Sequence, residues 1–218
     1  MRSVLLLTPL EWLWTAIGVI LTILGTLIHL SFPAEMPWLG GYSFSLQMGG
    51  MLLTACLAGP MAAVCAQIVY LGLGLAGVQV FAQGGGWQYL YQPTFGYLLG
   101  FLPGAWVCGT LAFRKRDPKP HPSRREYQGR PRLPAPSETT LGNGSIVPVG
   151  LRELGAASLA AVALVHVTGI IYLLGTQAWD QQLLELIRLY SLYTLPGQVI
   201  VASFASLLAL LLRRLLLF

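Results

Sequence analysis

The chain has 218 residues, of which 55% are hydrophobic and only 10% are charged, and its formal net charge is +5. Soluble domains carry roughly 25% charged residues, so this chain has too few charged side chains to cover a surface in water. The composition therefore excludes a soluble enzyme or a nucleic-acid-binding domain, and it predicts an integral membrane protein.

Six stretches lack Asp, Glu, Lys and Arg and approach the roughly 20 apolar residues that a membrane-spanning helix needs. In chain order the predicted spans are Trp12–Ser31, Tyr42–Gly59, Met61–Phe81, Thr94–Phe113, Leu154–Leu174 and Leu195–Leu212. The dipeptide Gly59-Pro60 is typical of a turn and predicts a tight reversal between the second and third spans. The predicted fold is all-α, a single membrane domain of six transmembrane helices over residues 1–218.

The segment 114–150 differs from the spans because it is rich in Pro, Gly, Ser and Arg. Such a composition buries too little apolar surface to fold alone, so we expect a flexible basic linker that connects the fourth and fifth spans of the membrane domain. With six alternating spans, twelve of the thirteen Lys and Arg residues fall on the side of the linker and the termini, and only Arg188 falls on the other. Because cytoplasmic loops collect Lys and Arg, we predict a multi-pass plasma-membrane protein with both termini in the cytoplasm.

The three connections on the other, outer side are rich in aromatic residues, which is typical either of a membrane-interface belt or of a binding site. One of them contains the run Gly84-Gly85-Gly86, whose bare backbone can approach a ligand closely. Another spaces Trp179, Leu183 and Tyr190 as in an amphipathic helix. We expect that helix to lie along the outer surface, either as a plain connector or as a lid over a site.

Uncharged polar side chains inside the spans mark the candidate site, because lipid offers them no hydrogen-bond partner. Gln47, Tyr97 and Gln198 lie in the outer third of three different spans. Their amide and phenol groups, together with glycine backbone, suit a small neutral polar ring better than an ion. His29 and His166 are expected to be structural histidines with satisfied hydrogen bonds rather than metal ligands.

Several kinds of chemistry lack the residues that they need in this sequence. The six spans hold no Asp, Glu, Lys or Arg for a proton relay or for cation coupling, and the chain has no P-loop motif for ATP. No nucleophile–base pair and no metal-ligand spacing occurs within the spans, and Cys56, Cys65 and Cys108 are expected to be apolar packing residues. We therefore expect no enzymatic activity, no metal and no cofactor.

Five short motifs recur in a known family of membrane proteins. They are Ser45-Leu46-Gln47, Leu57-Ala58-Gly59-Pro60, the glycine cluster after Val80-Phe81, Pro93-Thr94 with Gly96–Phe101, and Leu195-Pro196-Gly197. In these motifs the chain resembles the BioY family, the biotin-specific S components of energy-coupling-factor (ECF) vitamin importers. The resemblance is close over about half of the chain.

The resemblance implies an ECF S-component bundle that binds biotin, or a similar small molecule, from the outer face for uptake. It also implies partners within the lipid bilayer and beside it, namely a transmembrane scaffold subunit and ABC-type ATPases that supply the energy. Nucleic acid is not an expected partner.

One motif departs from the family pattern. The family follows Leu-Pro-Gly with an acid and, three residues later, a lysine, which by the resemblance would hold the ureido ring and the carboxylate of biotin. Here Gln198 and Val201 stand at those positions. Gln198 can still hydrogen-bond a urea group, whereas Val201 cannot bind a carboxylate, and Arg188 is the candidate replacement. The predicted substrate-binding residues are Gln47, Gly84, Gly85, Gly86, Tyr97, Arg188 and Gln198.

These departures leave three functions open. The first is uptake of biotin, energised by the separate scaffold and ATPase module. The second is the same fold binding a related heterocyclic vitamin, or acting as a solitary transporter that forms a homo-oligomer. The third, more remote, is a membrane enzyme or assembly factor built on the same scaffold.

Overall fold

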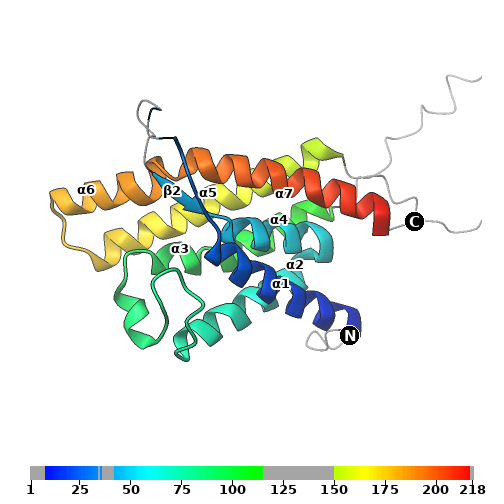
Figure 1. Cartoon of the computed structure of the whole chain (residues 1–218), viewed down its shortest axis with the longest axis horizontal. Coiled ribbons are helices and arrows are strands. Elements are labelled where there is room, and N and C mark those ends of the chain that lie inside the picture. The colour runs from blue at the N-terminus through cyan, green and yellow to red at the C-terminus, as the bar shows by residue number, and fades with distance from the viewer. Residues whose placement is uncertain (1–7, 34, 36–41, 115–149, 217–218) are drawn as a thin grey trace, which may run out of the picture. The chain divides into compact units, whose positions relative to one another are not determined.

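The computed structural model describes residues 8–33, 35, 42–114 and 150–216 (Figure 1). Its elements in chain order are α1 (Pro9–Leu27), β1 (His29–Ser31), β2 (Ser43–Ser45), α2 (Gln47–Leu75), η1 (Trp87–Tyr91), α3 (Phe95–Leu99), α4 (Phe101–Ala112), α5 (Leu151–Thr176), α6 (Gln181–Ile187), η3 (Arg188–Leu192) and α7 (Leu195–Leu216). By its contacts the chain divides into one unit, Met1–Phe113 with Val149–Phe218, and a second, Arg114–Pro148. All of these helices and strands belong to the first unit. The predicted linker 114–150 lies almost wholly outside the described residues and stays a prediction.

Helix α1 begins at a complete N-terminal cap and buries a polar face. The Thr8 hydroxyl accepts from the backbone N–H of Glu11 at 3.3 Å, and the Glu11 carboxylate accepts from the backbone N–H of Thr8 at 2.7 Å, which is a capping box. On the buried face, Thr15, Thr22 and Thr26 each donate to the carbonyl four residues earlier. The face packs against α2 with no loss of hydrogen bonding at these hydroxyls.

Helix α2 is a helical hairpin. Gly59 has φ 85° and ψ −179° and is followed by Pro60, so the helix breaks at this dipeptide. The Gln47 amide nitrogen donates to the Tyr70 hydroxyl at 2.8 Å, whereas 23 residues of continuous helix would hold them roughly 34 Å apart. The chain therefore reverses at Gly59, as Figure 1 shows from the cyan to the teal part of the ribbon, and the predicted reversal is confirmed.

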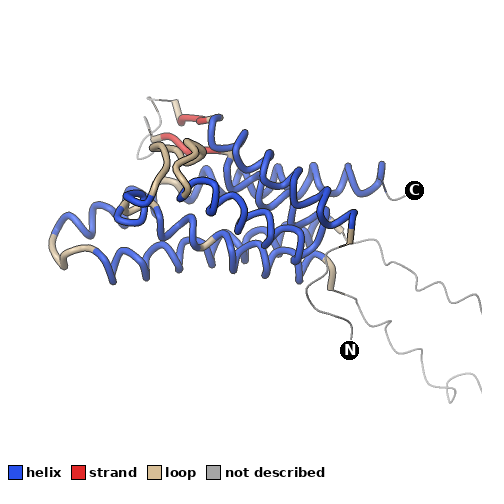
Figure 2. Tube along the Cα trace, turned by 90° about the horizontal axis from the view of Figure 1, so that it is seen from below, coloured by secondary structure: helices blue, strands red, loops and turns tan. Residues whose placement is uncertain are grey.

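Five stretches of the described residues are long and apolar enough to cross a membrane, and α2 is one of them. Because α2 doubles back, these five stretches make six passes, which matches the predicted number. α3 and α4 together form the fourth pass, α5 the fifth, and α7 the sixth. Figure 2 shows the passes as a bundle of side-by-side helices.

Two predicted spans end earlier than expected. The first was expected to reach Ser31, but α1 stops at Leu27, and the next residues pair as β1 with β2 in an antiparallel ladder that places Leu30 opposite Phe44. The third was expected to reach Phe81, but the helix stops at Leu75, and Gly77 follows with φ 101°. Apolar composition alone does not distinguish strand or turn from helix over so few residues.

Small residues allow the helices to approach closely at the end of the bundle that carries Gly59. A Cβ on Gly109 of α4 would lie 2.5 Å from the Pro60 nitrogen, and the Cys56 and Cys108 thiols lie 3.7 Å apart and fully buried. Both cysteines are therefore packing residues as expected, while Cys65 is half-buried. We refer to this end, around Gly59, Ala112 and Arg213, as the closed end.

Arg213 of α7 completes the closed end. Its Nε donates to the Cys56 carbonyl oxygen at 2.8 Å, and its Nη1 donates to the Ala112 carbonyl oxygen at 3.3 Å. Its guanidinium also lies 4.4 Å from the ring centre of Phe113. The Cys56 carbonyl is the one that residue 60 would satisfy in a continuous helix, and Pro60 has no N–H to give. Arg213 supplies the missing donor.

Candidate functional site

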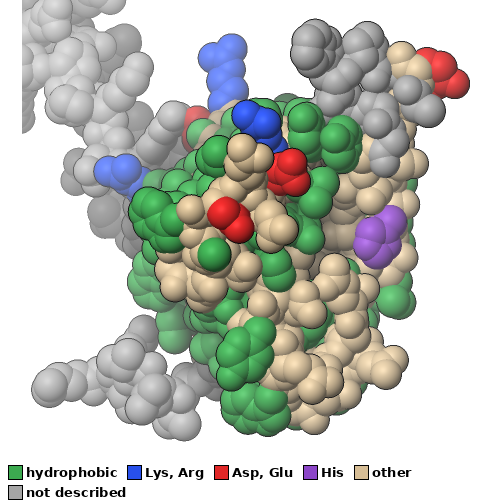
Figure 3. Space-filling model, turned by 90° about the vertical axis from the view of Figure 1, so that its left-hand side faces the viewer, with side chains coloured by type: hydrophobic (Ala, Val, Ile, Leu, Met, Phe, Trp, Pro, Cys, Tyr) green, Lys and Arg blue, Asp and Glu red, His purple; other side chains and the backbone are tan. Residues whose placement is uncertain are grey.

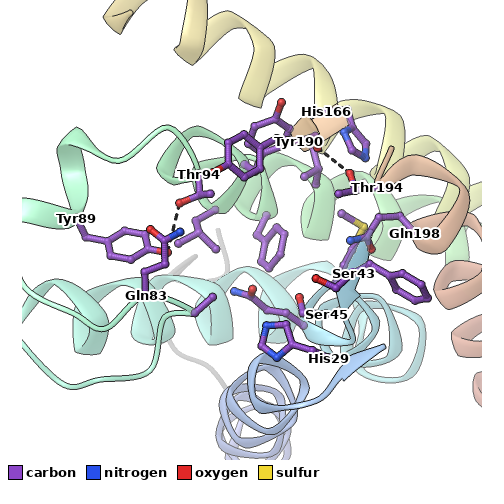
Figure 4. Close-up of a pocket in the computed structure, with 18 residues that line it drawn as sticks. His29, Ser43, Ser45, Gln83, Tyr89, Thr94, His166, Tyr190, Thr194 and Gln198 are labelled. Carbon is purple, nitrogen blue, oxygen red and sulfur yellow. Dashed lines mark hydrogen bonds between the residues drawn. The ribbon is translucent and has the colours of Figure 1, made fainter. Parts of the chain in front are cut away.

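A cavity of about 300 Å³ lies at the end of the bundle opposite the closed end (Figure 4). Segments from β1, β2, the start of α2, η1, α3, α5, η3 and α7 all contribute to it. The polar lining residues are His29, Ser43, Ser45, Gln47, Gln83, Tyr89, Thr94, Tyr97, His166, Tyr190, Thr194 and Gln198. The apolar lining residues are Phe44, Met48, Ala82, Leu98, Phe101 and Val165. The volume is at the lower end of the range for small-molecule sites.

None of the described residues that line the cavity is Asp, Glu, Lys or Arg. The end of the molecule shown in Figure 3 is likewise mostly hydrophobic and uncharged polar, with a few charged side chains near its upper part. The lining offers amide, hydroxyl and imidazole groups beside aromatic rings. Such a site suits a small ligand with neutral hydrogen-bonding groups.

Gln47 lines the cavity and is held by a buried network beneath it. Its amide nitrogen donates to the Tyr70 hydroxyl at 2.8 Å, and that hydroxyl donates to the Val80 carbonyl oxygen at 3.0 Å. The Thr26 hydroxyl lies 3.3 Å from the Tyr70 hydroxyl. The network ties α1, both arms of α2 and the segment after α2 together, so the position of Gln47 depends on all of them.

Tyr97 joins three elements around the cavity. Its hydroxyl and the Ser191 hydroxyl are 2.7 Å apart, which ties α3 to η3. Its ring meets His166 of α5 edge-on, with 5.7 Å between ring centres and 77° between planes, and its ring centre lies 6.1 Å from that of Tyr190. Gly169 makes room for the ring, because a Cβ there would lie 2.5 Å from it. Tyr97 therefore forms part of the wall.

Three polar atoms in this wall have no hydrogen-bond partner among the described residues. They are both ring nitrogens of His166 and the Oε1 atom of Gln198, all buried. His166 as a residue is 6% exposed. Buried polar groups are almost always paired in folded proteins, so these atoms point to a ligand or to water. Figure 4 shows His166, Thr194 and Gln198 close together on one side of the cavity, with His29, Ser43 and Ser45 across from them.

Tyr89 closes another side of the cavity. Its ring packs between Phe81 and Phe95, and its hydroxyl accepts from Thr94 at 3.3 Å. Burial raises the pKa of Tyr89, and the Thr94 hydrogen bond opposes this only in part. A phenol with a raised pKa stays protonated in the physiological range, so it contributes a neutral donor.

The predicted glycine run lies beside the cavity rather than on its surface. Gly84 and Gly86 have φ near +100°, and the Gly86 N–H donates to the Gly74 carbonyl oxygen at 2.7 Å. A Cβ on Gly85 would overlap the carbonyl oxygen of Val78. The three glycines fold the loop that presents Gln83, a lining residue. Direct contact of these glycines with ligand stays a prediction.

The structure places away from the lining both Arg188, the predicted carboxylate-binding residue, and Val201, which stands where the family has a lysine. Arg188 is exposed at the start of η3, two residues before the lining residue Tyr190. Val201 is 4% exposed and packs on Gly49, where a Cβ would lie 2.9 Å from Val201 Cγ1. The expected amphipathic helix is present as α6, which continues into the π-helix η3.

Sequence reasoning missed the two histidines as site residues. His29 was expected in a helix, but it lies on β1 and lines the cavity. His166 was expected to be satisfied, but neither of its nitrogens has a partner in the part of the chain that the structure describes. The signal was present: His166 is a lone ionisable residue in an apolar span. Those described residues include no group of three or more His, Cys, Asp or Glu that would hold a metal.

The fold and the cavity define a class of protein, a six-pass helical membrane protein with a small-molecule cavity at one end of its bundle. Comparison with known proteins identifies the family. The BioY family profile matches residues 2–218. The chain therefore belongs to the BioY family, a family of membrane transport subunits and not of enzymes.

Individual relatives agree with this family. The chain is 41% identical over 98 residues to the probable biotin transporter BioY of Lysinibacillus sphaericus, covering 45% of this chain and 46% of that protein. It is 44% identical over 80 residues to the biotin transporter BioY of Thermotoga maritima, covering 36% of this chain and 47% of that protein. The matched part thus spans about half the length of these curated relatives.

Two further matches cover nearly the whole chain. An uncharacterized protein of Cyanophora paradoxa is 25% identical over 215 residues, covering 94% of this chain and 95% of that protein. The crystal structure of the S-component for biotin from an ECF-type ABC transporter has a TM-score of 0.61, with 96% of this chain and 95% of that chain covered. Its sequence identity is 19%, so this likeness concerns the fold alone, and it confirms the predicted S-component bundle.

Proposed function

We propose that this protein is the substrate-binding membrane subunit for uptake of biotin. The observation that carries the proposal is the uncharged cavity, in a chain of the BioY family, with an unpartnered buried amide oxygen at Gln198. Biotin combines a cyclic urea, which carries two N–H donors and one carbonyl acceptor, with an apolar ring and a chain that ends in a carboxylate. Amides and hydroxyls beside aromatic rings complement the ring system.

In this proposal Gln47, Tyr97 and Gln198 contact the ligand, and Gly84, Gly85 and Gly86 hold the loop beside it. Arg188 binds the carboxylate of biotin at the point where the acyl chain of the ligand leaves the cavity. The cavity opens toward the outside of the cell, and both termini and the linker lie in the cytoplasm of the plasma membrane, as the distribution of Lys and Arg indicates. A scaffold subunit and ABC-type ATPases supply the energy for release.

Binding of radiolabelled biotin to the purified protein in detergent tests the proposal. We expect saturable binding that unlabelled biotin displaces. Absence of binding at micromolar ligand, from protein that unfolds cooperatively on heating, would overturn it. Uptake by a biotin-auxotrophic cell, with and without coexpressed scaffold and ATPase genes, then separates the coupled mechanism from a solitary homo-oligomer.

A second ligand class is supported by the position of Val201. No Lys or Arg lines the cavity among the described residues, and Val201 packs on Gly49 instead of facing a ligand. A heterocycle without a carboxylate would bind such a site without needing a cation. The affinities for biotin and biotinamide distinguish these two ligand classes. A preference for biotin that Arg188→Ala abolishes supports carboxylate binding by Arg188. Equal affinity for biotin and biotinamide supports a ligand without a carboxylate.

A further inference from the structure

His166 is the most deeply buried hydrogen-bonding side chain of the cavity that has no partner. It lies on α5, is 6% exposed, and both of its ring nitrogens are unpaired among the described residues. The Tyr97 ring packs edge-on against it and Val165 precedes it in the lining. Among the described residues these surroundings supply no hydrogen bond, so His166 lines the cavity with both of its ring nitrogens unpaired.

The second unpaired group of the wall is Gln198. Its Oε1 atom is buried without a partner, and it comes from α7, on the same side of the cavity as His166 (Figure 4). A neutral imidazole has one N–H donor and one acceptor nitrogen, and a carboxamide oxygen is an acceptor. The Gln198 oxygen can therefore accept from an N–H group of a cyclic urea, and one nitrogen of His166 can either donate to the urea carbonyl or accept from the other N–H group.

We propose that His166 is a ligand-contacting residue that binds the cyclic-urea head of the ligand together with Gln198. This assignment rests on the proposed function, and it adds a contact from α5 to the residues predicted from the sequence. It also orients the ligand, because the urea would lie between α5 and α7 and the chain that ends in the carboxylate would extend toward Arg188. The imidazole then has a partner only when the cavity is occupied.

The test uses the full-length purified protein, with His166→Phe as the variant and Thr168→Val on the same helix as the control. Among the described residues, the Thr168 hydroxyl donates to the Leu164 carbonyl oxygen of its own helix. We expect His166→Phe to weaken biotin binding by about tenfold to a hundredfold, the effect of losing hydrogen bonds to a buried polar group. Thr168→Val should leave biotin binding unchanged.

Stability without ligand separates ligand binding from a structural role. Replacing an unpaired buried polar group with an apolar one is close to neutral or stabilising, so the ligand-free His166→Phe protein should melt at or above the temperature of the native protein. A large fall in that temperature would indicate that His166 supports the fold, and would overturn the assignment.

Two biotin analogues locate the contact on the ligand. In 2-iminobiotin the ureido oxygen is replaced by nitrogen, and in biotinamide only the carboxylate is changed. We expect His166→Phe to reduce the preference of the native protein for biotin over 2-iminobiotin. The ratio of the affinities for biotin and biotinamide should stay unchanged. A thermodynamic cycle that combines the protein substitution with the ligand change measures this coupling. A change confined to the biotinamide ratio, or native affinity in the variant, would overturn the assignment. Failure of the native chain to bind biotin would instead overturn the proposed function itself.

Discussion

Gln198 is a partly buried residue of the cavity whose amide oxygen is buried without a partner among the described residues. We expect Gln198→Leu to weaken biotin binding by about 1–3 kcal/mol, because the urea N–H it accepts from would enter the cavity without a partner. Titration of labelled biotin measures the change. Gln182→Leu is the matched control, since Gln182 is exposed on α6. An unchanged affinity in Gln198→Leu would remove Gln198 from the site.

Arg213 acts far from the cavity, and its effect should be on stability. It donates to the carbonyls of Cys56 and Ala112 at the closed end, and the Cys56 carbonyl has no N–H four residues later because residue 60 is proline. We expect Arg213→Leu to lower the free energy of unfolding by about 1–3 kcal/mol. Its neighbour Arg214 is exposed, so Arg214→Leu is the control.

Thermal melting of the ligand-free proteins in the same detergent measures the difference. The Arg213 variant should melt several degrees lower and, once folded, bind biotin like the native chain. Equal melting temperatures of the two variants would show that water replaces the guanidinium at those carbonyls without cost.

At the scale of the elements, the start of α7 explains why a glycine follows Leu195-Pro196. A Cβ on Gly197 would overlap the ring of Phe44, which lies on β2 and lines the cavity. We expect Gly197→Ala to displace β2 and weaken biotin binding at least tenfold, since Phe44 and the neighbouring Ser43 and Ser45 move together. The affinity for labelled biotin is the measurement.

The control for this variant is Gly175→Ala. Gly175 lies in α5 with open space where a Cβ would be, so alanine there should leave binding unchanged and slightly stabilise the helix. A Gly197→Ala protein with native affinity would mean that the Phe44 ring rotates aside without moving the strand.

Elements that depend on local composition were predictable, and those that depend on distant partners were not. The spans and the Gly59 reversal follow from apolar length and from one Gly-Pro dipeptide. β1 pairs with β2 so that His29 lies opposite Ser45, although residues 32–42 separate the two strands in the sequence. No local sequence pattern predicts this pairing. Gln47 and Gln198 were recognisable as polar residues in apolar helices. His166 carried the same signal, but its lack of a partner is visible only once α3, α5 and α7 are packed.

At the scale of the whole molecule, the cavity and the linker should be independent. The lining residues come from residues 29–101 and 165–198, all outside the segment 114–150. We expect a Gly/Ser sequence of equal length in place of residues 120–144 to leave the affinity of purified protein for biotin unchanged. The replacement removes Arg124, Arg125, Arg130 and Arg132, so the amount of correctly inserted protein should fall.

Binding of labelled biotin and the yield of membrane-inserted protein measure these two effects separately. A changed affinity would show that the linker reaches the cavity. An unchanged yield would show that the remaining Lys and Arg residues suffice to set the orientation.

The core between the cavity and the closed end has a thermodynamic consequence. Six residues of this region are fully buried and belong to one hydrophobic core cluster of the described residues, namely Met51, Leu52, Ala55, Cys56, Ala105 and Cys108. We therefore expect a bound molecule to exchange with one aqueous compartment only, so that the occupancy of the site reports the chemical potential of the ligand in that compartment. Under the proposed function, moving a bound molecule across the bilayer would require a different conformation, and only transport against a concentration gradient would require an external source of work.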